Sequence, residues 1–297
     1  MKSLLILLFA AGLTGTALAA SAPKRVLLVT TTTGFRHSSI PVGEQVLREL
    51  AAKSGEFAII STSESPDYPT YPEPGKQGGT GPALDAQVGK VLAPLMSAEA
   101  LKTYDAIVFL STVGQLPLPD MDAFFAWVEG GGAVIGIHAA TDSLHGTPRY
   151  ARMMGGAFDF HGKQAVGEVV TMDPGHAGAM GWGATRSLHE EFYIFKLYDR
   201  SRVRSVLSMN RRPDDGRGEA GAAGHFPVSW ARSEGKGRIF YTALGHREDV
   251  WDPVAMPPGA KERMNSPEVA LAFQAHLLGG IRWALGLAPG ESIPQPQ

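Results

Sequence analysis

Strand-like apolar runs alternate with amphipathic helical segments in the first half of this chain, and this alternation limits the fold more than any other feature. Residues 26–29 and 133–137 are almost wholly apolar, which is typical of strands covered on both faces. Residues 40–52 and 120–128 carry apolar side chains at helical spacing. Repeated strand–helix–strand units predict a mostly parallel sheet with right-handed crossovers, and therefore an α/β fold.

The rest of the chain continues this pattern less regularly. Further strands are expected at residues 57–60, 105–110, 166–172, 203–209, 227–231 and 238–242. An amphipathic helix at 269–285 closes the chain. Residues 63–82 are rich in Pro and Gly and are expected to form an exposed insertion, and residues 211–224 form a second, charged loop. Because the α/β pattern resumes directly after each, residues 21–297 are expected to form one domain.

The first twenty residues have the features of a secretory signal peptide. Lys2 precedes an apolar stretch at residues 4–13, and small residues at 17–19 offer a cleavage site. The apolar run is shorter than the roughly 20 residues of a membrane-spanning helix, so an uncleaved anchor is the less favoured alternative. We expect a periplasmic or secreted protein with no stable membrane span after residues 1–20 are removed. The lack of cysteine suits an oxidising compartment.

Composition and missing motifs exclude several classes of function. The 297 residues include 27 Lys and Arg against 29 Asp and Glu, and a net charge of −2 is unlike that of a nucleic-acid-binding protein. The absence of cysteine excludes thiol nucleophiles and thiolate metal sites. Neither a phosphate-binding P-loop nor a Gly-x-Gly-x-x-Gly fingerprint after the first strand occurs, so no nucleotide cofactor is expected.

Three histidines each follow a predicted strand. His37 comes after the first strand, His138 directly after residues 133–137, and His246 shortly after residues 238–242. Ligands of open parallel sheets bind beyond the carboxyl ends of the strands, where these three side chains would meet. A single histidine of this kind is most simply a structural residue with a satisfied hydrogen bond, whereas three at one edge favour a functional site.

The turn around His138 has the local pattern of a nucleophile elbow. Residues 136–140 read GIHAA, in which small residues flank a side chain exposed on a tight, strained turn. Imidazole at this position can serve as a general acid or base, or as a neutral metal ligand. The alternative is a tight turn that carries a histidine by chance.

Carboxylates and further imidazoles occur after the elbow. His161 follows a Gly-rich segment, and Glu190 and Glu191 precede an aromatic pair. Side chains alternate in an extended segment, so only one of the two carboxylates is expected to face a pocket, and spacing alone does not decide which. A carboxylate beside imidazoles can fix a tautomer, complete a metal shell or move a proton. His145 and His276 are expected to be structural.

Taken together, these motifs resemble the trehalose-utilisation (ThuA-like) family, which belongs to the class I glutamine amidotransferase-like superfamily. The resemblance extends over residues 24–285. The segments that carry it are residues 33–37 (TGFRH), 131–142 (GGAVIGIHAATD), 155–158 (GGAF) ahead of His161, 190–193 (EEFY), 227–230 (PVSW) and 235–246 (GKGRIFYTALGH).

This resemblance implies a flavodoxin-like three-layer sandwich with a mostly parallel central sheet, and a role in carbohydrate metabolism on disaccharides or their keto derivatives. True amidotransferases of this fold carry cysteine at the elbow, where this chain has His138. Glutaminase chemistry is therefore not carried over.

Two departures from the family pattern narrow the set of matched residues. The acidic pair of the family is usually Asp-Glu and is here Glu190-Glu191, and a usual His-Pro pair is here His176 followed by alanine. Glu191 and Tyr193 remain as matched positions, and the resemblance thus selects Glu191 as the carboxylate of the site.

The leading hypothesis is a periplasmic or secreted enzyme that acts on a sugar. The expected catalytic residues are His138, His37 and Glu191. Residues expected to bind substrate are Arg36, Asp142, Tyr193 and Arg247. A divalent metal, most simply zinc, would be held by His37, His138, His161 and His246 and would polarise a substrate carbonyl. A keto group acidifies its α-proton, so isomerisation or elimination suits these bases better than hydrolysis by two carboxylates.

Two alternatives stay open at the level of sequence. The first is a non-catalytic sugar-binding protein on an amidotransferase-like scaffold, in which Trp182, Trp230 and Trp251 stack against sugar rings and Arg36 and Arg247 bind hydroxyls or carboxylates. The second is an interaction module that uses the exposed insertions. The substrate, the reaction and the oligomeric state are not fixed by the sequence.

Overall fold

A computed structural model describes residues 22–71 and 81–295, so the predicted leader and the middle of the predicted insertion lie outside the described residues. Its strands are β1 (Lys24–Val29), β2 (Phe57–Ser61), β3 (Ala106–Leu110), β4 (Val113–Gly114), β5 (Ala133–Ile137), β6 (Asp142–Ser143), β7 (Ala157–His161), β8 (Ala165–Thr171), β9 (Thr185–Glu190), β10 (Tyr193–Lys196), β11 (Arg204–Arg211), β12 (Ala223–Glu234) and β13 (Gly237–Thr242). Its α-helices are α1 (Ile40–Ser54), α2 (Pro82–Leu95), α3 (Ala98–Leu101), α4 (Met121–Glu129), α5 (Pro148–Met154), α6 (Glu248–Trp251) and α7 (Pro267–Ala284).

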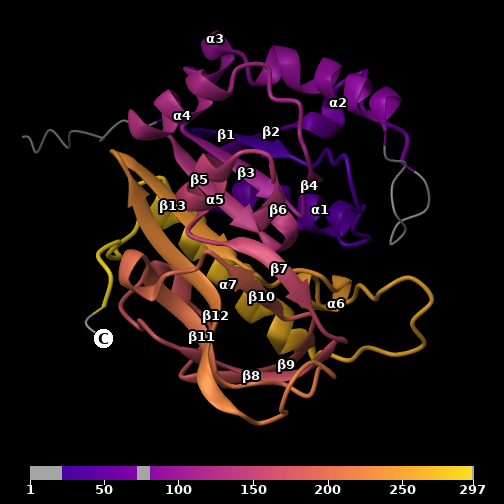
Figure 1. The fold of residues 1–297 in the computed structure, drawn as a ribbon, viewed down its shortest axis with the longest axis vertical. Coiled ribbons are helices and arrows are strands. Elements are labelled where there is room, and N and C mark those ends of the chain that lie inside the picture. Colours follow the sequence, from indigo (N-terminus) through magenta and orange to yellow (C-terminus); the bar gives the residue numbers. More distant parts are fainter. Residues whose placement is uncertain (1–21, 72–80, 296–297) are drawn as a thin grey trace, which may run out of the picture.

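A nine-stranded sheet forms the centre of the molecule, in the order β2-β1-β3-β5-β13-β12-β11-β8-β9 (Figure 1). The strands from β2 to β13 in this order run parallel to one another. Beyond β13, each strand is antiparallel to its neighbours. The predicted α/β fold with a large central sheet is confirmed, and the sheet is not purely parallel.

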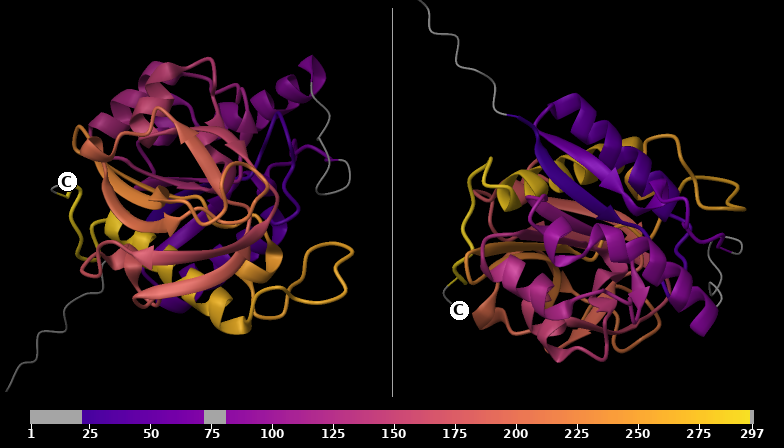
Figure 2. Two further views of the ribbon diagram at one scale, coloured as in Figure 1. Left: turned by 60° about the horizontal axis from the view of Figure 1, so that its bottom comes forward. Right: turned by 90° about the horizontal axis from the view of Figure 1, so that it is seen from above.

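Helices cover both faces of the parallel part, which explains its continuous apolar runs. In β1, Val26 and Leu28 pack into the hydrophobic cluster that contains α1 and α7. Leu27 and Val29 point the other way, into the cluster that contains α2 and α4. Figure 2 shows the helices distributed on the two sides of the sheet.

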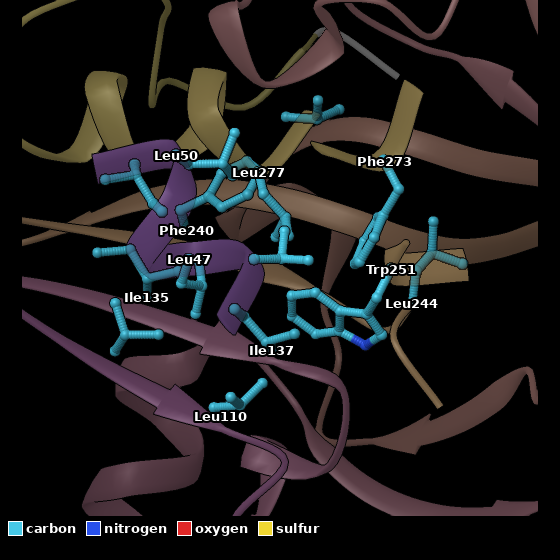
Figure 3. Close-up of a cluster of buried hydrophobic side chains, with 14 of the residues drawn as sticks. Leu47, Leu50, Leu110, Ile135, Ile137, Phe240, Leu244, Trp251, Phe273 and Leu277 are labelled. Carbon is cyan, nitrogen blue, oxygen red and sulfur yellow. The ribbon is translucent and has the colours of Figure 1, made fainter. Parts of the chain in front are cut away.

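The cluster on the α1 and α7 side joins the helices to the strands that carry the candidate site. Figure 3 shows side chains from α1, α7 and α6 packed together over β3, β5 and the end of β13. The labelled residues are Leu47, Leu50, Leu110, Ile135, Ile137, Phe240, Leu244, Trp251, Phe273 and Leu277. All ten are buried. This packing fixes the carboxyl ends of β3, β5 and β13 relative to one another.

A second, two-stranded sheet pairs β10 with β7 in antiparallel fashion and is drawn near the centre of Figure 1. The chain leaves the main sheet at the end of β9 and enters this small sheet at β10, and Glu191 and Phe192 make the connection. Nine elements have no counterpart among those expected from the sequence: α2, α3, α5, α6, β4, β6, β7, β9 and β10. Among the residues that the structure describes, no helix is long and apolar enough to span a membrane.

Candidate functional site

His138 follows the last residue of β5 and lies on a tight turn. The backbone of this turn is strained, as expected of a nucleophile elbow. The φ angle of His138 is 52°, a left-handed conformation that is uncommon for a residue with a Cβ. Gly136 makes the turn possible, because a Cβ at this position would lie 2.3 Å from Cε of Met154 and 3.0 Å from Cδ2 of Tyr241. The elbow predicted from the sequence is therefore present, with imidazole at its tip.

The ring of His138 is fully buried and hydrogen-bonded at both nitrogens. Nδ1 lies 2.8 Å from the carbonyl oxygen of Ala243, which can only accept, so Nδ1 carries the proton. In the neutral ring, Nε2 then presents a lone pair and accepts a hydrogen bond from the Tyr193 hydroxyl at 3.0 Å. The backbone thus fixes the tautomer and directs Nε2 at Tyr193, His246 and Glu191, which line the cleft, although His138 itself does not.

His37 and His246 bring their rings against that of His138. The ring centroid of His37 lies 4.7 Å from that of His138 and 5.4 Å from that of His246. His246 Nδ1 is 3.2 Å from His138 Nε2. His37 is buried, and its Nδ1 has no hydrogen-bond partner. Three imidazoles from three strand ends therefore meet at one point.

Glu191 adds a carboxylate to this group. Its Oε2 atom lies 3.4 Å from His246 Nδ1 and 3.8 Å from His138 Nε2, and its Oε1 atom lies 3.2 Å from His161 Nδ1. One side-chain donor atom each from His37, His138, His246 and Glu191 lies within 4.8 Å of the other three. We call these four residues the His3Glu cluster.

Burial sets the charge of the His3Glu cluster. It lowers the pKa of His37 and His138 well below the usual value, and the neighbouring imidazoles lower it further. It also lowers the pKa of His246 to about 4. Burial raises the pKa of Glu191 to about 7, against the opposing effect of His161. Near neutral pH the imidazoles are uncharged, and the carboxyl group can both give and take a proton.

A cleft of about 300 Å3 opens above the cluster. The residues that line it are Phe35, His37, Val113, Asp142, Phe158, His161, Glu191, Tyr193 and His246. Phe35, Val113 and Phe158 give it apolar walls, whereas the ionisable side chains gather on the other surfaces. An apolar wall with a few convergent polar groups is the usual composition of a small-molecule site.

The sequence of this chain matches a known protein family. The sequence model of the ThuA family, described as "Trehalose utilisation", matches residues 25–256. The chain belongs to the ThuA family. A comparison with curated protein sequences finds no match.

Two solved ThuA-like structures share the fold. The ThuA-like protein from Parabacteroides merdae superposes with a TM-score of 0.61 at 18% identity, over 91% of this chain and 92% of that one. The ThuA-like protein from Bacteroides uniformis gives a TM-score of 0.58 at 20% identity, over 91% of this chain and 94% of that one. At these identities the likeness extends to the fold alone.

The predicted substrate-binding residues divide into two groups in this ThuA protein. Asp142 and Tyr193 line the cleft. Arg36 and Arg247 do not. Arg36 donates to the Tyr68 hydroxyl at 2.9 Å and lies over the ring of Tyr71, while Arg247 forms a bidentate ion pair with an aspartate of α6. The structure therefore brings only two of the four predicted substrate ligands to the cleft.

Tyr68 and Tyr71 belong to the predicted insertion, and its described part is docked on the sheet. The Tyr71 hydroxyl accepts a hydrogen bond from the Thr32 amide at 2.8 Å, and the Tyr68 hydroxyl lies 2.9 Å from Oγ1 of Thr30. These contacts hold the start of the segment against the residues that follow β1. Residues 72–80 lie outside the described part of the chain.

His161 and the tryptophans differ from what the sequence indicated. His161 lies at the rim of the cleft, where its side chain is 44% exposed, and it contacts the His3Glu cluster only through Glu191. Trp182, Trp230 and Trp251 are fully buried. The suggestion that these indoles stack on a sugar is therefore wrong: they are core residues.

Two groups that contribute to the site were not predicted from the sequence. The carbonyl of Ala243 orients His138, but a main-chain acceptor has no signature in the sequence. Glu190 was discounted, yet its fully buried carboxyl group accepts hydrogen bonds from two site residues. Burial raises its pKa well above the usual value. The sequence carries one signal for Glu190: side chains alternate in direction along an extended segment, so one of the carboxylates at 190 and 191 is expected to face inward.

Proposed function

We propose that this ThuA protein is an enzyme that performs acid–base chemistry on a disaccharide or its keto derivative in the cleft above the His3Glu cluster. The observation that carries the proposal is the meeting of three neutral imidazoles and a carboxyl group of raised pKa at one strained elbow. Perturbed ionisable groups that converge in a cleft are characteristic of catalytic sites.

Glu191 is the proton carrier in this proposal when no metal ion is bound to it. Its pKa of about 7 matches the requirement of a general base that must also return the proton. Abstraction of the proton on the hydroxyl-bearing carbon next to a substrate carbonyl leaves an enediolate. Return of that proton to the former carbonyl carbon, with transfer of the hydroxyl proton to the former carbonyl oxygen, completes an isomerisation. Elimination of a β-substituent is the other outcome of the same step. Tyr193 lines the cleft, and its hydroxyl, which donates to His138 Nε2, can accept a hydrogen bond from a substrate hydroxyl.

The donor set also fits a divalent metal of the zinc type. His138 donates Nδ1–H to a backbone carbonyl and turns its Nε2 lone pair, which accepts from the Tyr193 hydroxyl in this structure, toward the other cluster members. A second-nitrogen hydrogen bond to a carbonyl is the usual arrangement of a metal-ligating histidine. His37 has a buried Nδ1 without a partner, and Glu191 supplies an oxygen. Neutral imidazoles and a carboxylate are common zinc ligands. Such an ion would polarise the carbonyl group of a bound keto-sugar.

The place of the cleft suits a sugar. It lies beyond the carboxyl ends of β1, β5 and β13, and open parallel sheets bind their ligands at that edge. Phe35 and Phe158 offer apolar surface to the C–H face of a pyranose, and Asp142 offers a hydroxyl acceptor. No cysteine stands at the elbow, so glutaminase chemistry forms no part of the proposal.

The test is turnover of a keto-disaccharide by purified mature protein, with and without added zinc. The proposal predicts turnover that His138→Ala reduces by at least 1,000-fold. A matched His225→Ala variant keeps it, because His225 contacts Tyr198 and Ser208 and no residue that lines the cleft. Sugar binding without turnover at any metal concentration would support the non-catalytic sugar-binding alternative instead. Neither binding nor turnover across a panel of disaccharides and keto-disaccharides would overturn the proposal.

We also propose that the protein is exported to the periplasm or secreted. The support is the pattern of residues 1–20 alone, with a basic start, an apolar stretch and a small-residue cleavage site. Amino-terminal sequencing of protein purified from its own cells is the test. A mature start near residue 20 or 21 is expected, and an intact Met1 in the bulk of the protein would contradict export.

A further inference from the structure

A buried polar network behind the His3Glu cluster joins the end of β9 to the loop that carries His246. Glu190 is its first link. The Oε1 atom of Glu190 accepts the amide hydrogens of His246, at 3.0 Å, and of Glu191, at 3.1 Å. The residue has no exposed surface. A single carboxyl oxygen therefore ties together the backbones of two cluster members that are 55 positions apart in the sequence.

Asn265 and Asp249 form a second link beside the first. Asn265 accepts the amide hydrogen of His189 at 2.8 Å and donates to the His189 carbonyl at 2.9 Å, so it pairs with the strand end as a neighbouring strand would. Its amide group also donates to Asp249 at 2.9 Å. Asp249 in turn binds the guanidinium of Arg247 in a bidentate ion pair.

From these contacts we infer that Glu190 is a positioning residue: its carbonyl-type oxygen holds the backbones of His246 and Glu191 so that their side chains meet in the cluster. The inference deepens the proposed function and rests on it for the catalytic consequence only. Arg247, Asp249 and Asn265 support the same junction from the other side. Arg247 therefore has a structural role: its side chain binds Asp249 and does not line the cleft.

The geometry makes Glu190 hard to replace by water or by a smaller side chain. The two amide hydrogens that it binds are directed into a buried space, and a buried amide without a partner is costly. Without this acceptor, the chain around His246 is free to shift until its amide finds another partner. A shift of about 1 Å at a catalytic group is enough to cost two orders of magnitude in rate.

The experiment compares Glu190→Gln with Glu190→Ala in the full mature chain. Glutamine keeps a carbonyl oxygen for both amides, whereas alanine removes it. Glu56→Gln, which alters a surface ion pair with Arg282 away from the site, is the matched control. Three quantities are measured: amide hydrogen exchange at His246, zinc affinity by calorimetry, and kcat/KM on the keto-sugar.

Glu190→Ala is expected to speed exchange of the His246 amide at least 10-fold and to weaken zinc binding and kcat/KM by 10- to 100-fold, as loss of an outer-shell partner does. Glu190→Gln and Glu56→Gln are expected to stay within threefold of wild type in all three. Unchanged exchange at His246 in Glu190→Ala overturns the inference. Equal damage in Glu190→Gln and Glu190→Ala also overturns it, because the charge would then matter rather than the acceptor.

Two further arms keep the result decisive. If Glu190→Ala does not fold, Asn265→Ala tests the second link, and it is expected to speed exchange of the His189 and His246 amides; unchanged exchange there counts against the network. If the wild-type protein shows neither turnover nor zinc binding, the proposed function fails, but the exchange comparison still decides the role of Glu190 because it needs no ligand.

Discussion

The Nδ1 atom of His138 lies 2.8 Å from the carbonyl oxygen of Ala243, and this contact determines which ring nitrogen keeps a lone pair for Tyr193 and His246. Because the carbonyl can only accept, the ring proton stays on Nδ1 and the lone pair of Nε2 is directed at Tyr193 and His246. Ala243 stands three residues before His246, so the strand end that supplies His246 also sets the tautomer of His138. His138 and Ala243 meet because β5 and β13 are neighbours in the sheet, although they are far apart in the sequence.

Tyr193→Phe tests the direction of the bond to His138. In the wild type, the Tyr193 hydroxyl occupies the Nε2 lone pair that a metal needs. A net hydrogen bond is worth about 1 kcal/mol, so its removal is expected to tighten zinc binding about fivefold. Calorimetric titration of metal-stripped protein measures this directly. Weaker binding in the variant would mean that the phenol oxygen itself is a ligand.

Gly136→Ala tests the steric basis of the elbow. The new methyl group would lie 2.3 Å from Cε of Met154 and 3.2 Å from Cβ of Ala140, and such overpacking typically costs about 1–3 kcal/mol. Urea unfolding gives the loss in stability. Since Met154 supplies the closest atom, Met154→Ala combined with Gly136→Ala is expected to cost less than the sum of the two single changes. Strict additivity would show that the methyl group is accommodated elsewhere.

The pH dependence of stability should reveal the buried histidine of α7. His276 is fully buried, and burial lowers its pKa to about 4. Between pH 6.5 and about 4 the unfolded chain thus binds a proton that the folded chain does not, so stability falls as the pH falls through this range. The contribution is on the order of 3 kcal/mol. Chemical unfolding at pH 7, 5.5 and 4.5 measures it.

His276→Asn is the matched variant for this measurement. An asparagine amide can replace the hydrogen bond from Nδ1 to the carbonyl of Gly178 without a titrating group. The variant is expected to lose less stability than the wild type on acidification, even if it is less stable at pH 7. An identical loss in both proteins would place the acid sensitivity elsewhere, with His176, whose pKa burial also lowers to about 4, as the next residue to change.

The parallel half of the fold was predictable because strands that are buried on both faces have continuous apolar sequences. Strands such as β3, Ala106–Leu110, and β5, Ala133–Ile137, are apolar at every position, and α4 has a clear helical stripe. The small strand β7, Ala157–His161, has four side chains that are exposed or half-buried, so its sequence has no buried apolar pattern that would predict a strand. Antiparallel pairing of β8 with β11 joins residues such as Thr171 and Leu207, which are far apart in the sequence, and no local pattern encodes it.

The same distinction applies to the site. Histidines at strand ends were visible because the carboxyl edge of a parallel sheet is defined by the strands themselves. The engagement of Arg36 with Tyr68, and of Arg247 with Asp249, depends on how loops fold back on the sheet. A charged side chain near a predicted site therefore looked like a ligand for substrate, although its partner is another residue of the chain.

Zinc titration of the metal-stripped mature protein tests the central claim most directly, because it asks whether His37, His138, His246 and Glu191 act as one centre. The account predicts one zinc ion per chain, with affinity lowered at least 100-fold by His37→Ala and by His246→Ala, and unchanged by His225→Ala, whose imidazole contacts Tyr198 and Ser208. The absence of zinc binding in the wild type, or equal binding in wild type and His246→Ala, would contradict it.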